Sequence, residues 1–261
     1  MKAVILCAGF GTRLGDLTRK LPKPMLPLQG RPLLVYNLAY LASEGLREIA
    51  INLHFQPQRI TEYFGDGSRF GVRIHYSFEP VLLGTAGAVK NLEPWLGRDE
   101  DFVVQYGDLL LDQDLGVLFE SHRRTGAIAT LLLHQREGSN SLVATDADGS
   151  ITGFVERPTP QQSESLRWRW VNSGLYVLHP RILDYIPAGQ PYDFPRDVFA
   201  TLVGRERLQG VPLSGYRCAI DSPERYRQAN RDIESGLYRP RFFAAEGVER
   251  FRRIDGWRMS L

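Results

Sequence analysis

The stretch KAVILCAGFGTRL, residues 2–14, decides the fold, because an apolar run is followed by two glycines and then by an arginine. Residues 2–7 predict a buried strand, and residues 9–30 predict a long loop. Residues 32–45 predict a helix, since Leu34, Leu38 and Leu41 share one face, with a proline near the start and Gly45 at the end. A buried strand, a loop and an amphipathic helix form the first half of a parallel strand-helix-strand unit.

Strands and helices continue to alternate along the first half of the chain. Strand patterns occur at residues 48–55, 72–79, 101–106 and 127–134, and helical patterns at 57–64, 85–96 and 115–124. After residue 138 shorter strands follow at 142–145, 151–156 and 170–178, with a turn at 146–149, and two more helices at 195–205 and 223–235. The sequence therefore predicts an α/β fold: a doubly wound, Rossmann-like, mixed but mainly parallel sheet with helices on both faces, and a β-rich lobe on the same sheet.

The domain prediction is one principal domain at residues 1–236, divided into parts at 1–138 and 139–236, and a tail at 237–261. The tail is rich in arginine and aromatic residues, including Phe242, Phe243, Phe251 and Trp257. We interpret it as a helix or arm packed on the domain or on a second copy of the chain, which would make a homo-oligomer; an RNA or membrane contact is the alternative.

Composition excludes several classes of protein. Lys and Arg total 32 against 30 Asp and Glu, so a net charge of +2 gives the whole protein no reason to bind nucleic acid or a membrane. The two cysteines, Cys7 and Cys218, cannot build a disulfide framework, which indicates a reducing, cytoplasmic setting. The first apolar run is too short for a signal peptide, and no run approaches the length of a membrane-spanning helix.

Positive charge gathers around the first glycine loop. A strand that ends in a glycine loop presents backbone N–H groups at the edge of a sheet where α/β folds bind ligands. Arg13, Arg19, Lys20 and Lys23 follow, opposed by Asp16, and prolines on both sides stiffen Lys23. This pattern favours a polyphosphate ligand; the alternative for Gly9 and Gly11 alone is a tight turn.

Two familiar phosphate motifs do not fit. A dinucleotide-binding fingerprint needs a third glycine where Leu14 stands, and no Walker A Gly-Lys-Ser/Thr occurs in the chain. A nicotinamide-dependent dehydrogenase and a P-loop ATPase are therefore disfavoured.

The strand at residues 102–106 ends in Gly107-Asp108. A carboxylate at the carboxyl end of a buried strand suits Mg²⁺ bridging phosphates, so Asp108 is the predicted metal ligand, with a turn residue as the alternative. Asp112 and Asp114 are interpreted as a turn residue and the N-cap of the next helix.

On these motifs the sequence resembles the sugar-1-phosphate nucleotidylyltransferases over about residues 1–236. Further matches are Glu79-Pro80 with Leu83-Gly84-Thr85-Ala86-Gly87-Ala88, Val155-Glu156-Arg157-Pro158 and Val171-Asn172-Ser173-Gly174-Leu175-Tyr176. The resemblance implies a nucleotide-binding part at 1–138 and a sugar-binding part at 139–236. It implies nucleotide binding by Leu6, Ala8, Gly9, Gly11, Thr12, Arg13, Lys23, Glu79, Pro80, Gly84 and Thr85, and sugar-phosphate binding by Gly107, Glu156, Arg157, Asn172 and Gly174. It also implies catalytic roles for Arg13, Lys23 and Asp108.

Two positions depart from the family pattern. Arg157 stands where the family commonly has Lys, so a planar guanidinium group replaces the compact charge of an ammonium group. The closing motif usually begins with a metal-binding Asp, but Ala219 holds that place here, so Asp221 is the second candidate metal ligand. The alternative is that Asp221 and Ser222 cap the helix that starts at Pro223.

The implied reaction joins a nucleoside triphosphate and a sugar 1-phosphate into a nucleotide-sugar and pyrophosphate, with Mg²⁺ as cofactor. A phosphate monoester is already largely ionised at neutral pH, so neither a protein nucleophile nor a general base is needed. The segment from Glu79 to Ala88 is most similar to guanylyltransferases acting on mannose or heptose 1-phosphate, which favours GTP. Uridylyl, thymidylyl or cytidylyl transfer to another sugar, and a non-catalytic regulatory subunit that binds nucleotide-sugar, are the alternatives.

Overall fold

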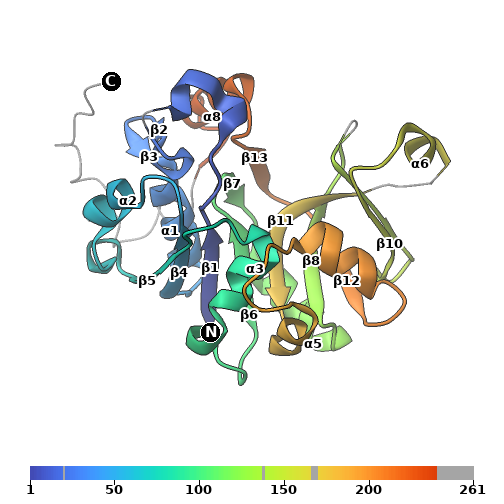
Figure 1. Cartoon of the computed structure of the whole chain (residues 1–261). Helices are drawn as coiled ribbons and strands as arrows, with labels where there is room; N and C mark the ends of the chain where they lie inside the picture. The colour runs from blue at the N-terminus through green and yellow to red at the C-terminus, as the bar shows by residue number, and fades with distance from the viewer. Residues whose placement is uncertain (20, 137–138, 166–169, 240–261) are drawn as a thin grey trace. The chain divides into compact units, whose positions relative to one another are not determined.

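A seven-stranded mixed, mainly parallel sheet confirms the predicted α/β class (Figure 1). The computed structural model describes residues 1–19, 21–136, 139–165 and 170–239. The strands follow the order β12 (Leu208–Pro212), β8 (Ala129–His134), β11 (Val171–Leu178), β6 (Phe102–Tyr106), β1 (Lys2–Leu6), β4 (Glu48–Leu53) and β5 (Arg73–Phe78). β12 runs parallel to β8 and β4 parallel to β5, whereas β11 is antiparallel to both of its neighbours.

The chain folds as two compact units, each made of several segments. The first unit comprises Met1–Val4, Glu79–Gln105 and Asp114–Ser214. The second comprises Ile5–Phe78, Tyr106–Gln113 and the described part of Gly215–Leu261. Each unit therefore combines segments that are far apart in the sequence.

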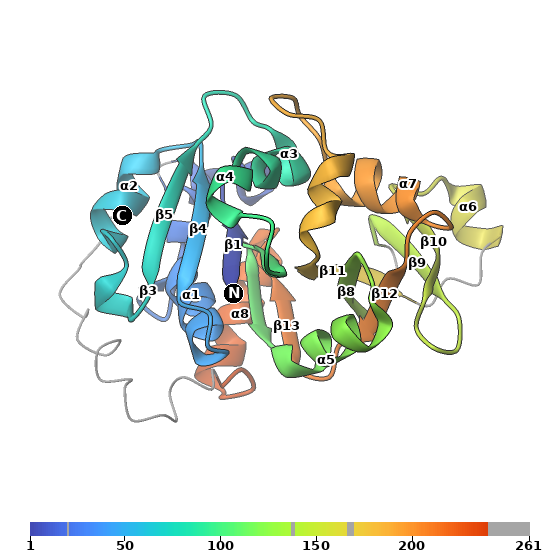
Figure 2. The same ribbon diagram turned by 90° about the horizontal axis from the view of Figure 1, so that it is seen from below.

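The first unit is built around β8, β11 and β12, with α5 (Leu115–Thr125) packed against β8 and β12 (Figure 2). Its core includes Tyr176, Phe194 and Phe199, which are fully buried and whose ring centroids lie 5.0 to 5.9 Å apart. Its other elements are α3 (Gly84–Asn91), α4 (Glu93–Leu96), β9 (Ser141–Thr145), β10 (Ile151–Glu156), α6 (Pro160–Ser165), η4 (Pro180–Tyr185), η5 (Phe194–Phe199) and α7 (Ala200–Leu202).

In the second unit β4 and β5 lie side by side, and β7 (Leu109–Asp112) pairs antiparallel with β13 (Tyr216–Ala219). Tyr36, Tyr216 and Tyr238 cluster, with neighbouring ring centroids 4.9 and 6.3 Å apart. The remaining elements are η1 (Thr12–Thr18), η2 (Lys23–Met25), β2 (Pro27–Leu28), β3 (Arg31–Pro32), α1 (Leu33–Ser43), α2 (Pro57–Phe64), η3 (Ser68–Phe70) and α8 (Pro223–Glu234).

Several sequence predictions need correction. Strands β7, β12 and β13 were not predicted, and Asp112 ends β7 instead of lying in a turn. The helix predicted at 85–96 divides at Leu92 into α3 and α4, since Pro94 lacks the N–H that would continue the hydrogen-bond ladder. The helix predicted at 195–205 is a π-helical turn followed by one short α-helical turn, and the loop at 9–30 contains η1 and η2.

Other predictions are confirmed. Helix α2 has the predicted bounds, and the Asp114 side chain caps α5 by accepting a hydrogen bond from the Gly116 N–H. Lys20 and the tail from residue 240 onward, with its predicted helix or arm, lie outside the described residues.

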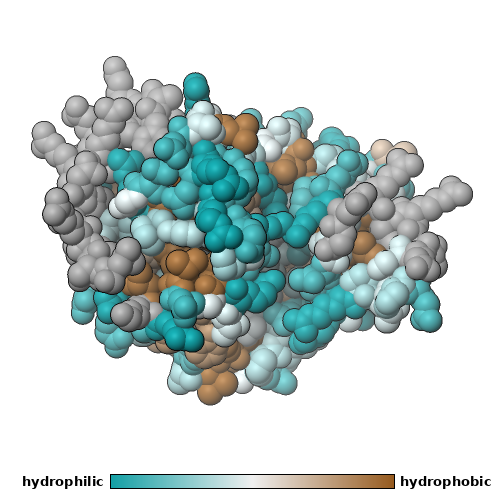
Figure 3. All heavy atoms as spheres, turned by 90° about the horizontal axis from the view of Figure 1, so that it is seen from above, coloured by the Kyte–Doolittle hydropathy of each residue, from teal (hydrophilic) through white to brown (hydrophobic). Residues whose placement is uncertain are grey.

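Hydrophilic side chains dominate the face drawn in Figure 3, with small apolar areas between them. Within the described residues, every helix is too short or too polar to cross a bilayer.

Gly107 makes the tightest backbone approach near the end of β1. A Cβ atom there would lie 2.5 Å from the Cys7 Sγ and 2.8 Å from the Leu6 carbonyl oxygen, which accepts a hydrogen bond from the Gly107 N–H at 2.9 Å. We expect Gly107→Ala to lower the free energy of unfolding by about 1–3 kcal/mol, because overpacking forces the backbone apart.

Gly9→Ala is the matched control, since nothing lies within 4 Å of a Cβ at that position. Its stability should stay within about 0.5 kcal/mol of wild type. Urea denaturation of the three proteins measures both values, and equal stabilities would contradict the close approach.

Candidate active site

The loop after β1 is anchored at both ends. The Cys7 N–H donates to the Asn52 Oδ1 at 2.7 Å, and the Thr18 hydroxyl donates to the Gly11 carbonyl at 3.0 Å. Gly11 has φ +66°, and a Cβ there would lie 3.1 Å from Thr18 and 3.3 Å from Lys23, so a larger residue would be strained. Leu6 is the last residue of β1 and Ala8, just after it, is buried. Gly9, Thr12 and Arg13 are exposed. The hydrogen bonds thus fix the loop backbone, and the loop exposes the Arg13 guanidinium group to solvent.

Lys23 and Asp108 form an ion pair, with the ammonium nitrogen 2.6 Å from the carboxylate Oδ2. The residues are 85 positions apart in sequence, and their side chains are 12% and 26% exposed. Burial raises the pKa of Asp108, but the charge and hydrogen bond of Lys23, with the guanidinium groups of Arg217 and Arg13, bring that pKa below its usual value. Asp108 is therefore a carboxylate at neutral pH.

Asp221 lies in the same part of the second unit. The Ile220 N–H donates to the Asp108 carbonyl at 2.8 Å, which places the backbone before Asp221 beside Asp108. The Asp221 carboxylate is 3.7 Å from Arg13 and 3.5 Å from Arg225. Ser222, rather than Asp221, caps α8 by accepting from the Arg225 N–H. The Asp221 carboxylate thus pairs with arginines instead of capping the helix, while Ala219 is buried in β13.

Two carboxylates fit a magnesium ion but not a site made wholly of protein ligands. Over the described residues, no group of three or more His, Cys, Asp and Glu side chains could hold a metal. Mg²⁺ usually takes one or two carboxylates and completes its shell with water and substrate phosphates. Asp108 and Asp221 supply that number of hard oxygen donors.

Three residues of the second unit were not singled out from the sequence. Arg217 and Arg225 act on Asp108 and Asp221, and Asn52 fixes the Cys7 amide. Asn52 carried a signal, because it is a polar residue inside the apolar strand at 48–55 and is only 3% exposed. The two arginines carried no such signal, because neither belongs to a motif: Arg217 stands alone among uncharged residues, and Arg225 lies in a charged helix.

The segment from Glu79 to Gly87 belongs to the first unit. Glu79 is 3% exposed and its Oε2 accepts the Leu83 N–H at 3.0 Å, so part of its carboxylate shapes the loop, with Pro80 next to it. Gly84 has φ +71°, and a Cβ there would lie 2.6 Å from the Tyr192 carbonyl oxygen. A Cβ at Gly87 would meet the Gln190 carbonyl oxygen at 2.7 Å. Both glycines are required by contacts within the chain itself.

Glu156 and Asn172 are both neighbours of Ser141. Glu156 pairs with Ser141 in the β9–β10 register, and the Asn172 N–H donates to the Ser141 hydroxyl at 3.0 Å. The Asn172 side chain donates to Tyr176 at 2.7 Å and accepts the Gly174 N–H at 3.1 Å, within an irregularity of β11 where Gly174 has φ +78°.

The electrostatics of Glu156 are unusual. Burial, the largest effect, and the charge of Asp193 raise its pKa from 4.5 to about 7 against the opposing charges of Arg157 and Arg196. Arg157 is exposed, and its φ of 53° is uncommon for a residue other than glycine. Such strained positions cluster at functional sites.

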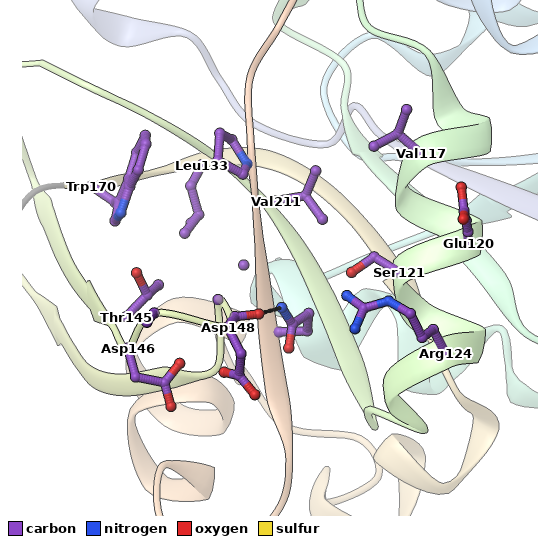
Figure 4. A pocket seen from close by; sticks show the side chains of 15 residues that line it. Val117, Glu120, Ser121, Arg124, Leu133, Thr145, Asp146, Asp148, Trp170 and Val211 are labelled. Carbon is purple, nitrogen blue, oxygen red and sulfur yellow. Dashed lines mark hydrogen bonds between the residues drawn. The ribbon is translucent and has the colours of Figure 1, made fainter.

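A separate cavity of about 460 Å³ lies in the first unit (Figure 4). Trp170 and Leu133 lie on one side of it in the view, and Arg124 and Glu120 project from α5 on the other. None of its lining residues is a predicted site residue, and we assign the chemistry to the residues above because they carry the paired and perturbed charges.

Known proteins have sequences similar to most of this chain. A UTP–glucose-1-phosphate uridylyltransferase of Synechocystis sp. is 39% identical over 219 residues, which cover 78% of this chain and 55% of the relative. A mannose-1-phosphate guanylyltransferase of Mycobacterium tuberculosis is 32% identical over 239 residues, covering 90% of this chain and 65% of the relative. The chain thus spans less than two thirds of the length of these curated relatives.

Solved structures show the same fold. A putative glucose-1-phosphate thymidylyltransferase from Bacillus anthracis superposes with a TM-score of 0.80 at 21% identity, covering 93% of this chain and 99% of that chain. HddC from Yersinia pseudotuberculosis, complexed with GMP-PN, gives a TM-score of 0.74 at 24% identity, with 89% and 99% covered. The family model described as nucleotidyl transferase matches residues 2–236, and the chain belongs to this family.

Proposed function

We propose that this protein transfers a nucleoside monophosphate from a nucleoside triphosphate to a sugar 1-phosphate, releasing pyrophosphate. The observation that carries the proposal is the pairing of Lys23 with Asp108 and of Arg13 with Asp221 at the end of the glycine loop. This arrangement supplies cations for phosphates and carboxylates for a metal within one unit.

The reaction depends on positioning the two substrates more than on proton transfer. A phosphate oxygen of the sugar 1-phosphate attacks the α-phosphorus, a new P–O bond forms, and the bond to the β-phosphate breaks with its electron pair leaving on pyrophosphate. Arg13 and Lys23 would bind the triphosphate and stabilise the negative charge of the leaving group. Magnesium, held by Asp108 and Asp221, would neutralise phosphate charge.

Cys7 takes no part as a nucleophile. Burial, with a smaller contribution from Asp108, raises the pKa of its thiol well above the usual range, so the thiol stays protonated. This agrees with a reaction in which the substrate phosphate is itself the nucleophile.

The first unit would hold the organic parts of the substrates. The segment from Glu79 to Thr85 would contact the base and ribose, while Glu156 and Asn172 would bind sugar hydroxyls and Arg157 the sugar phosphate. We favour GTP with a mannose- or heptose-like sugar, since the Glu79–Ala88 segment resembles guanylyltransferases. UTP with glucose 1-phosphate is the second candidate, because the uridylyltransferase relative is 39% identical.

Pyrophosphate release tests the function directly. The purified protein is given Mg²⁺, each of GTP, UTP, dTTP and CTP, and a panel of hexose and heptose 1-phosphates that includes mannose and glucose 1-phosphate. We expect turnover with one preferred pair. Nucleotide-sugar binding without turnover on the whole panel would contradict catalysis and favour a regulatory subunit.

Replacing either member of the ion pair should remove most activity. We expect Lys23→Ala and Asp108→Asn each to lower kcat by about 10²–10³, because each removes a preorganised charge from the reacting phosphates. Arg73→Ala is the matched control, since Arg73 is a cation of the same unit whose side chain is 81% exposed and pairs with Glu48. Thermal melting checks that each variant is folded; near-normal kcat in a folded Lys23→Ala variant would exclude the proposed role.

Glu156 should make binding of the nucleotide-sugar product depend on pH. The diphosphate bridge of the product does not titrate near neutrality, whereas Glu156 ionises near pH 7. The ionised carboxylate is the stronger acceptor for sugar hydroxyls, so affinity should rise as pH increases through about 7. In Glu156→Gln this rise should disappear. Calorimetric titration at pH 6, 7 and 8 measures the change, and an unchanged pH profile in the variant would rule out Glu156 as its source.

A further inference from the structure

The start of α3 is capped by a distant segment of the first unit. The Tyr192 carbonyl accepts the Ala86 and Gly87 N–H groups at 2.8 and 3.0 Å, and the Asp193 Oδ1 accepts the Thr85 N–H at 3.1 Å. The first N–H groups of a helix have no partner within the helix itself. Here three of them are bound by the chain and are therefore not offered to a phosphate.

The Thr85 hydroxyl binds both Asp193 and the residue that follows it. The Thr85 hydroxyl donates to the Asp193 Oδ1 at 3.1 Å and accepts the Phe194 N–H at 2.8 Å. The Tyr192 N–H donates back to the Leu83 carbonyl at 2.9 Å. Since Gly84 also packs against the Tyr192 carbonyl, the backbone of Leu83–Thr85 is fixed by residues more than 100 positions away.

The Asp193 carboxylate also interacts with Arg196 and acts electrostatically on Glu156. Its Oδ2 lies 3.5 Å from Arg196, and its N–H donates to the Asp197 carboxylate at 2.8 Å. Asp193 and Arg196 both act electrostatically on Glu156, together with Arg157. One carboxylate therefore contacts the segment assigned to the nucleotide and influences the carboxylate assigned to the sugar.

We propose that Asp193 is a positioning residue: through its hydrogen bonds to Thr85 it fixes the start of α3 and, with it, the base-reading segment. This inference rests on the proposed function for the nucleotide ligand. The geometry of the Thr85–Asp193 contact is independent of that function.

Two substitutions separate the hydrogen bonds from the charge. Asp193→Asn keeps an acceptor oxygen for Thr85 but loses the charge, whereas Asp193→Ala loses both. Asp184→Asn is the control, because Asp184 is an exposed carboxylate of the same unit that pairs with Arg98. Nucleotide affinity and the pH profile of nucleotide-sugar binding are measured for all three and for wild type.

We expect Asp193→Ala to weaken nucleotide binding about tenfold, the effect of losing one or two hydrogen bonds, and to narrow the preference among the four triphosphates. Asp193→Asn should bind nucleotide within about threefold of wild type. Both variants should shift the midpoint of the nucleotide-sugar pH profile below that of wild type, since a negative neighbour of Glu156 has gone. Asp184→Asn should change neither property.

Hydrogen exchange in the ligand-free protein gives a readout that does not depend on function. Exchange of the Thr85, Ala86 and Gly87 amides should be faster in Asp193→Ala than in wild type and little changed in Asp193→Asn. Wild-type nucleotide affinity and amide exchange in Asp193→Ala would overturn the positioning role while the proposed function stands. A wild-type protein that binds no nucleotide would overturn the proposed function, while faster amide exchange in Asp193→Ala would still show that Asp193 orders the start of α3.

Discussion

The ion pair between Lys23 and Asp108 is the interaction on which the second unit's site depends. A partly buried carboxylate loses hydration, and this cost must be offset by a nearby cation. The close approach of Gly107 to Leu6 and the prolines on both sides of Lys23 hold the two charges at 2.6 Å. Asp221 is compensated in the same way by Arg13 and Arg225. In the proposed function, a metal–triphosphate complex would carry both signs of charge and would replace both kinds of partner without leaving a buried charge uncompensated.

In the proposed function the first unit would meet a different requirement, which is recognition of the base and the sugar. A base and a sugar differ from their competitors by the placement of a few polar atoms, so recognition needs backbone that does not shift. Ser141 binds the Asn172 N–H and pairs in register with Glu156, and Tyr192 with Asp193 fixes the start of α3. Glycines stand where two stretches of backbone approach too closely for a Cβ, as at Gly84.

Sequence reasoning was accurate where a pattern is local and strong. The helix at 57–64 and the Asp114 cap were predicted correctly, because capping and periodicity depend on neighbouring residues. It failed for β7, β12 and β13, which are only four or five residues long. Each of them is stabilised by pairing with a strand that is distant in the sequence. The helix predicted at 85–96 divided because Pro94 outweighed an otherwise helical pattern.

The sequence by itself determined the strand that ends in a glycine loop, the proline-flanked Lys23, and the Gly107-Asp108 dipeptide, because each is a property of adjacent residues. Only the tertiary structure decided that Asp221 pairs with Arg13 while Ser222 caps α8, and that Glu156 and Asn172 are both neighbours of Ser141. It also decided that Asp193 holds Thr85 across 108 positions. These contacts follow from strand register and chain closure, which join residues whose spacing in the sequence carries no trace of their distance in the fold.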